Sequence, residues 1–213
     1  TLRKAQVASQ KLIKQTKNTK IELLEIDLSD LTQINRAVDQ VASKFRGLDL
    51  LINNAGLMAP PRTLSQQGFE IQFAVNHLAH MALTLKLMPL LSQKIASRVV
   101  TISSGIQYMG KINWNDLQGE KIYNRWSSYS QSKLANVMFA LELDKLLQNA
   151  NYEVASLVVH PGVARTNLHS TSVSSNGSWQ EDFAYKLMNP FFQSASMGSL
   201  PQLFAATEPT AKR

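Results

Sequence analysis

The sequence predicts an α/β fold in which helices cover a parallel, doubly wound (Rossmann-like) sheet. Short apolar runs alternate with segments of helical length and helical apolar spacing. Several of the apolar runs end in Asn, Ser, Pro or Gly, which are typical of strand ends and turns. Strands that alternate with helices of this length are typical of a parallel sheet. With 213 residues, the chain is expected to form one domain with a sizeable core.

Composition narrows the class of protein. A hydrophobic content of 44% and a charged content of 17% are typical of a globular protein. The net charge of +7 could favour an anionic partner, but the lysines of the first 20 residues lack interleaved aromatic residues, so a solvated helix face is favoured. No apolar run reaches the roughly 18 residues that a membrane-spanning helix needs. The absence of cysteine excludes disulfides and thiolate metal sites.

The first elements follow from local patterns. Residues 2–17 predict a helix, and residues 21–27 predict a short strand bounded by polar residues. Asp30 is expected to cap the next helix with Gln33 as its capping-box partner, and Gly47 to end that helix.

The remaining elements continue the alternation. Strands are expected at residues 48–52, 98–103 and 153–159, and helices at residues 69–91 and 125–148.

Tyr129 and Lys133 suggest proton-transfer chemistry in the last of these helices. Residues four apart lie on the same helix face, so the phenol and the ammonium can point into one pocket. A neighbouring cation favours the phenolate and lowers a tyrosine pKa from its ordinary value of about 10. Such a phenol can exchange a proton with an alcohol or carbonyl oxygen. Taken alone, the pair is equally typical of a solvated helix face.

Three other segments favour proton-transfer chemistry over a solvated helix face. Asn53-Asn54-Ala55-Gly56, residues 99–104 (Val-Val-Thr-Ile-Ser-Ser) and His160-Pro161-Gly162 each close an apolar run. Together with the Tyr129 and Lys133 helix, they resemble the short-chain dehydrogenase/reductase family. Residues 114–118 (Trp-Asn-Asp-Leu-Gln) and 132–136 (Ser-Lys-Leu-Ala-Asn) are most similar to its retinol-dehydrogenase-like branch. The resemblance covers about residues 21–207.

The resemblance implies catalytic roles. Tyr129 would be the general acid/base, Lys133 would lower its pKa and hold the nicotinamide ribose, and Ser104 would bond the substrate oxygen. Ser103 is the adjacent alternative, but the family places the working serine second. Asn76 matches an asparagine that interrupts a helix and holds a water leading to the lysine. Its poor helix propensity calls for some such reason, although a polar residue on a helix face is the simpler alternative.

His77 and His80 have a spacing that could suit a metal ion. Because neither has a carboxylate or cysteine partner in register, packing is favoured and no metal site is predicted.

The resemblance also implies a cofactor, NADP or NAD, with NADP preferred. The expected cofactor-binding residues come from strand ends and from the catalytic pair: Asp27, Asn53, Ala55, Gly56, Tyr129, Lys133, Pro161, Gly162, Val163 and Thr166. Ordinary turns at the strand ends are the alternative. An aromatic-rich segment at residues 167–195 matches the family's substrate lid and would fit a bulky apolar alcohol or carbonyl.

One expected feature is missing. A dinucleotide-binding fold opens with a strand, a Gly-rich turn and a helix, yet no glycine precedes Gly47. By resemblance, the first two strands and the last strand of the sheet would be absent. We therefore expect residues 1–213 to be a partial dinucleotide-binding and catalytic domain, an internal fragment that is inactive by itself.

The predicted function is NAD(P)-dependent interconversion of a lipophilic alcohol with its ketone or aldehyde. A catalytically silent member that binds nucleotide or a partner protein is one alternative, and an inactive truncated product is another. The expected partner is a small-molecule substrate, with no nucleic acid and with no transmembrane segment in this fragment. Homo-oligomers through the helices of Asn76 and Tyr129 are compatible with the family, and a cytoplasmic location is expected.

Overall fold

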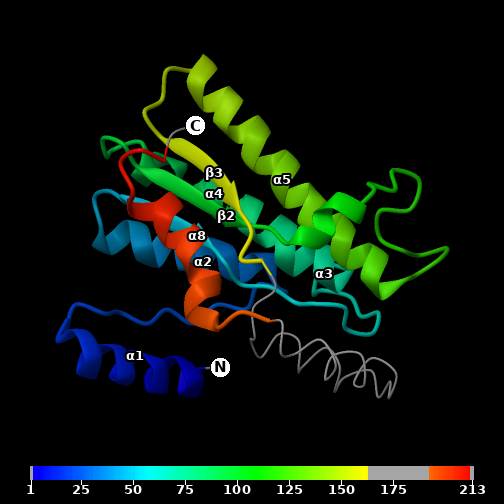
Figure 1. The fold of residues 1–213 in the computed structure, drawn as a ribbon, viewed down its shortest axis with the longest axis horizontal. Coiled ribbons are helices and arrows are strands. Elements are labelled where there is room, and N and C mark those ends of the chain that lie inside the picture. Colours follow the sequence, from blue (N-terminus) through cyan, green and yellow to red (C-terminus); the bar gives the residue numbers. More distant parts are fainter. Residues whose placement is uncertain (1, 163–191, 212–213) are drawn as a thin grey trace.

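The computed structural model describes residues 2–162 and 192–211 (Figure 1). The predicted contacts of Val163 and Thr166 lie outside the described residues, as does most of the expected lid at residues 167–195.

Three parallel strands form the sheet, in the order β1, β2, β3. They are β1 (Leu50–Asn53), β2 (Arg98–Ile102) and β3 (Ala155–Val159). Asn53 pairs with Thr101, and Ile102 pairs with Val159, so all three strands end at the same edge of the sheet. The predicted parallel sheet is confirmed, and its strands match the predictions at residues 48–52, 98–103 and 153–159.

Helices flank this sheet (Figure 1). The α-helices are α1 (Leu2–Thr16), α2 (Leu31–Lys44), α3 (Ile71–Phe73), α4 (Ala79–Leu91), α5 (Arg125–Asn149) and α8 (Ala195–Thr207). A π-helical turn, η1 (Ala74–Leu78), interrupts the helix predicted at residues 69–91, and a 3-10 turn, η2 (Gly105–Met109), follows β2. Of the helices in the described residues, none combines the length and the apolar character needed to cross a bilayer.

The two faces of the sheet are covered by different helices. Neighbouring strand residues point to opposite faces, as the period of two requires. Val99 packs with Leu91 of α4 and Leu143 of α5. Val100 packs on the other face with Ala205 of α8. The sheet is therefore covered on both faces, as expected for a Rossmann-like fold.

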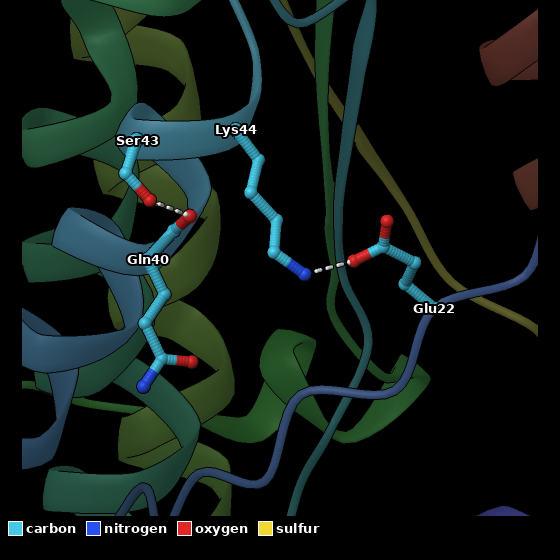
Figure 2. A network of polar contacts seen from close by, with 4 residues as sticks. All are labelled: Glu22, Gln40, Ser43 and Lys44. Atoms are coloured by element: carbon cyan, nitrogen blue, oxygen red, sulfur yellow. Dashed lines mark hydrogen bonds and ion pairs between the residues drawn. The ribbon is translucent and has the colours of Figure 1, made fainter.

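The predicted strand at residues 21–27 is wrong. No ladder forms there, and Leu23 and Leu24 are 42% and 41% exposed. Figure 2 shows one contact of the segment with α2: an exposed ion pair joins Glu22 to Lys44 at the end of the helix, where Ser43 donates to the Gln40 carbonyl. An exposed ion pair contributes at most about 1 kcal/mol and cannot replace ladder hydrogen bonds. The residue pattern is that of a strand, but a strand also needs a neighbouring strand to bond.

The caps of α2 differ in detail from the prediction. Asp30 is the N-cap and accepts the Thr32 N–H at 2.9 Å, as predicted. Gln33 does not complete a capping box, since its side chain accepts the Asp27 N–H at 3.0 Å. The helix ends in an extended Phe45, so Gly47 does not end it.

Candidate active site

A cavity of about 660 Å³ lies at the edge of the sheet where all three strands end. Ligands of open α/β sheets bind at this edge. The walls come from the three segments that follow the strands, from α5 and from α8: Asn54, Ala55, Gly56, Leu57 and Met58; Ile102, Ser103, Ser104, Gly105 and Ile106; His160, Pro161 and Gly162; Trp126, Tyr129 and Lys133; Ala195, Gly198, Ser199 and Gln202.

α5 places Tyr129 and Lys133 side by side in this cavity. The helix begins at Arg125 because Asn124 caps it, accepting the N–H groups of Trp126 and Ser127. One turn later Tyr129 is 4% exposed and Lys133 is 5% exposed. The Lys133 Nζ lies 6.0 Å from the centroid of the Tyr129 ring. The predicted shared face of the phenol and the ammonium is thus present.

Tyr129 is not, however, ionised easily in this structure. Burial raises its pKa, and a side-chain hydrogen bond with Ser104 opposes that rise. The expected lowering of this pKa by Lys133 is not found. The ammonium bonds the Ile102 carbonyl at 3.2 Å instead.

Lys133 carries a buried charge with no anionic partner among the residues that the structure describes. Burial lowers the pKa of its ammonium to about 8. Of its three N–H donors, one reaches Ile102 O. Gly56 keeps the space in front of the Lys133 ammonium open, because a Cβ at position 56 would lie 3.1 Å from Asn76 Oδ1 and 3.6 Å from Lys133 Nζ. The ammonium can therefore donate to a ligand in the cavity.

Ser103 and Ser104 have different surroundings. The Ser103 hydroxyl donates to the Lys133 carbonyl at 2.8 Å and also bonds the Gln107 side chain. Ser104 is only partly buried, and it lines the cavity together with Tyr129. This arrangement favours Ser104 as the residue that faces a substrate.

Asn76 lies behind the cavity rather than in its wall. It is fully buried in η1, and its amide bonds the N–H and the carbonyl of Leu57 at 2.7 and 2.9 Å and the Ser132 hydroxyl at 2.9 Å. The backbone carbonyl of Asn76 accepts from His80 Nδ1 at 2.9 Å, so that nitrogen carries the proton. Burial lowers the pKa of His80 to about 4, which keeps the ring neutral. His77 Nδ1 contacts Asn136 Oδ1 at 3.2 Å.

The predicted cofactor-binding residues divide into two groups. Ala55, Gly56, Tyr129, Lys133, Pro161 and Gly162 line the cavity. Asn53 and Asp27 do not. The Asn53 amide donates to Thr84 of α4 at 2.8 Å, and Asp27 is exposed, accepting the N–H and the hydroxyl of Ser29.

Sequence reasoning missed several wall residues. Trp126 stands three residues before Tyr129 on α5, so helical spacing could have revealed it. Met58 and the α8 residues carry no comparable signal. His160, to which the sequence analysis gave no role in the site, lines the cavity and packs edge-on against Tyr108, with ring centroids 6.4 Å apart.

The sequence is similar to those of several known proteins. The family model for short chain dehydrogenases matches residues 2–177. Human retinol dehydrogenase 12 is 37% identical over 205 residues, and human polyprenol dehydrogenase is 35% identical over 211 residues. These alignments cover 95% and 97% of this chain but 62% of each human protein, so the chain spans less than two thirds of their length.

Two solved structures show the same fold. A crystal structure of an uncharacterised protein from Mycobacterium paratuberculosis has a TM-score of 0.73 and 36% identity, covering 97% of this chain and 64% of that one. A short chain dehydrogenase from Burkholderia cenocepacia, solved in complex with NADP, has a TM-score of 0.61 and 22% identity, covering 86% of this chain and 68% of that one. The chain therefore belongs to the short-chain dehydrogenase/reductase family, in its retinol-dehydrogenase-like branch.

Proposed function

We propose that the protein carrying this chain is an NAD(P)-dependent oxidoreductase that interconverts a lipophilic alcohol with its aldehyde or ketone. The observation that carries the proposal is that Ser104, Tyr129 and Lys133 line one cavity, with the Lys133 Nζ 6.0 Å from the centroid of the Tyr129 ring.

The residues of the cavity fit a nicotinamide nucleotide. Gly56 leaves room for a ligand against the Lys133 ammonium, which has donors to spare for ribose hydroxyls. Gly162, with a φ of +66°, adopts a left-handed turn that favours glycine. Ala55 and Pro161 would contact the same ligand. When bound, the nicotinamide supplies or accepts the hydride. NADP is the preferred form on the basis of the family branch.

The side chains divide the remaining chemistry. Ser104 would hold the substrate oxygen by a hydrogen bond and stabilise the charge that develops on it. Tyr129 would give that oxygen its proton in reduction and take it back in oxidation. Lys133, still protonated at neutral pH, would hold the ribose hydroxyls of the nucleotide with the N–H donors that do not reach Ile102. Asn76 would keep Leu57 and Ser132 in place around this group.

The substrate class follows from the apolar part of the wall. Met58, Ile106 and Trp126 stand around the Tyr129 ring and offer no charge to a substrate. The names of the two human relatives refer to retinol and polyprenol, both lipophilic alcohols. We therefore place long-chain or cyclic apolar alcohols and carbonyls first.

Nicotinamide absorbance tests the proposal directly. The protein at its native length is assayed with NADH and NADPH against apolar aldehydes and ketones, alongside Tyr129→Phe. We expect turnover that falls by about 10²-fold or more in the variant, the usual weight of general acid/base catalysis. Nucleotide binding without turnover would reject the proposal and support a silent binding protein.

A further inference from the structure

Ala59 has a backbone conformation that alanine rarely adopts. Its φ is +45°, and the residue is fully buried. Left-handed backbone is unfavourable for a residue with a Cβ, and it persists only where surrounding structure enforces it. Such strain often marks a functional site.

Two side chains enforce this conformation. Gln72 Oε1 accepts the Ala59 N–H at 2.8 Å, and Arg125 Nη1 donates to the Ala59 carbonyl at 2.7 Å. Gln72 belongs to α3, and Arg125 is the first residue of α5. We call this pair, with Ala59 between them, the Ala59 clamp.

Further buried groups hold the clamp in place. Gln72 is fully buried, and its Nε2 donates to the Tyr123 hydroxyl at 3.1 Å and to the Arg125 carbonyl at 3.0 Å. The Glu70 carboxylate accepts the Gln72 N–H at 3.0 Å and the Tyr123 hydroxyl at 3.2 Å. Since both ends of the Gln72 amide are bonded, its orientation is fixed.

The clamp acts on the wall beside the phenol. Met58, next to Ala59 in the chain, is 6% exposed, and both residues pack against Tyr129. Met58 and Trp126 also line the cavity. The residue with the strained backbone, Ala59, therefore packs directly against the ring of the proposed acid/base.

We propose that Gln72 and Arg125 are positioning residues that press Met58 and Ala59 onto the Tyr129 ring, thereby keeping water from the phenol and setting the width of the substrate side of the cavity. The effect on the substrate side of the cavity rests on the proposed function. The exclusion of water from the phenol does not, because it depends only on the side chains of this protein.

Gln72→Leu tests the clamp without changing charge. Gln131→Leu is the matched control, since Gln131 is also buried and its amide also bonds loop backbone, at Asn113 and Leu117, without lining the cavity. The pKa of Tyr129 is read from tyrosinate absorbance as the difference from the same protein with Tyr129→Phe. We expect Gln72→Leu to lower it by about one pH unit, because water relieves the desolvation that raises it. The control should leave it unchanged.

Arg125→Met is the second variant, and it tests whether the clamp keeps water from the phenol if Gln72→Leu does not fold. In the described part of the chain, Lys133 and His160 are the other ionisable residues of the cavity wall, and Arg125, Glu70 and Tyr123 are those of the clamp and its surroundings. Loss of the Arg125 cation by itself would raise the Tyr129 pKa, so a fall in this variant can come only from water. In turnover, both variants should raise KM for cyclic carbonyls by about tenfold and change kcat less.

A Tyr129 pKa that stays unchanged in both variants, or that falls equally in Gln131→Leu, overturns the inference. Absence of turnover in the unmodified protein would reject the proposed function alone, because the absorbance titration still decides whether the clamp shields the phenol.

Discussion

Replacing Lys133 with methionine should stabilise the protein at pH 7 while abolishing the proposed turnover. Methionine keeps most of the aliphatic length and removes the buried charge. The folded pKa of about 8 lies below the ordinary 10.5 of lysine, so the unfolded chain binds the proton more tightly than the folded one. The protonated ammonium therefore opposes folding, and this penalty is complete below pH 8 and is lost as the pH rises to 10.5.

The size of the effect follows from the same two values. At about 1.4 kcal/mol per pH unit, the gap from 10.5 to about 8 is a penalty of about 3 kcal/mol at pH 7. The variant also loses the hydrogen bond to Ile102 O, which contributes about 1 kcal/mol. The net gain at pH 7 is then about 2 kcal/mol. At pH 10 the penalty has shrunk to about 1 kcal/mol, and the two proteins should be equally stable.

Urea unfolding at pH 7 and pH 10, followed by circular dichroism, measures this difference. Lys145→Met is the control, because Lys145 lies on the same helix with its side chain 68% exposed. Its effect on the free energy of unfolding should be small and equal at both pH values. A destabilised Lys133→Met at pH 7, or a difference that does not change with pH, would refute the reasoning.

Two further predictions concern the surroundings of Lys133. Gly56→Ala should weaken NADPH binding by about tenfold, because the new Cβ would crowd Asn76 Oδ1 at 3.1 Å and the space in front of the ammonium; calorimetry with an unchanged Kd would contradict it. His80→Asn should make the free energy of unfolding less sensitive to acid. The pKa of His80 is about 4 in the folded protein and ordinarily 6.5, so His80 lowers the stability of the fold as the pH falls from 6.5 to 4, by about 3 kcal/mol in total. Urea unfolding at pH 7 and pH 4.5 should show a smaller loss in the variant, and equal losses would count against it.

Much of the site could be predicted from sequence because a parallel sheet brings its strand ends together. Gly56, Ser104 and Gly162 follow different strands, yet they meet at one cavity. The position of Tyr129 and Lys133 needed only helical spacing.

The position of Asn53 could also have been corrected from sequence. In a strand, residues two apart share a face. Leu51 packs toward α4 and α5, so Asn53 points to that same face, where it meets Thr84.

Other features could not be read from local pattern. The extended but unpaired residues 21–27 depend on a neighbouring strand, which no property of the segment itself reveals. The contacts of Gln72 with Ala59 and Arg125 join three segments that are distant in the sequence or belong to different elements. Nothing in the spacing of these residues indicates that they meet.

Apolar packing along α5 offsets the free-energy cost of burying charged and polar side chains at the site. Its first half buries polar groups, among them Ser132, Asn136 and Lys133 of the cavity wall, where a helix would normally bury apolar ones. Its second half sends Leu143 and Leu147 into the apolar core with β2 and α4. Burying two such side chains contributes several kcal/mol, about the size of the penalty at Lys133. Packing about three to four turns away on the same helix thus offsets the cost of burying the ammonium. A substitution that weakens this packing should therefore reduce the order of the site even though no residue of the site itself is changed.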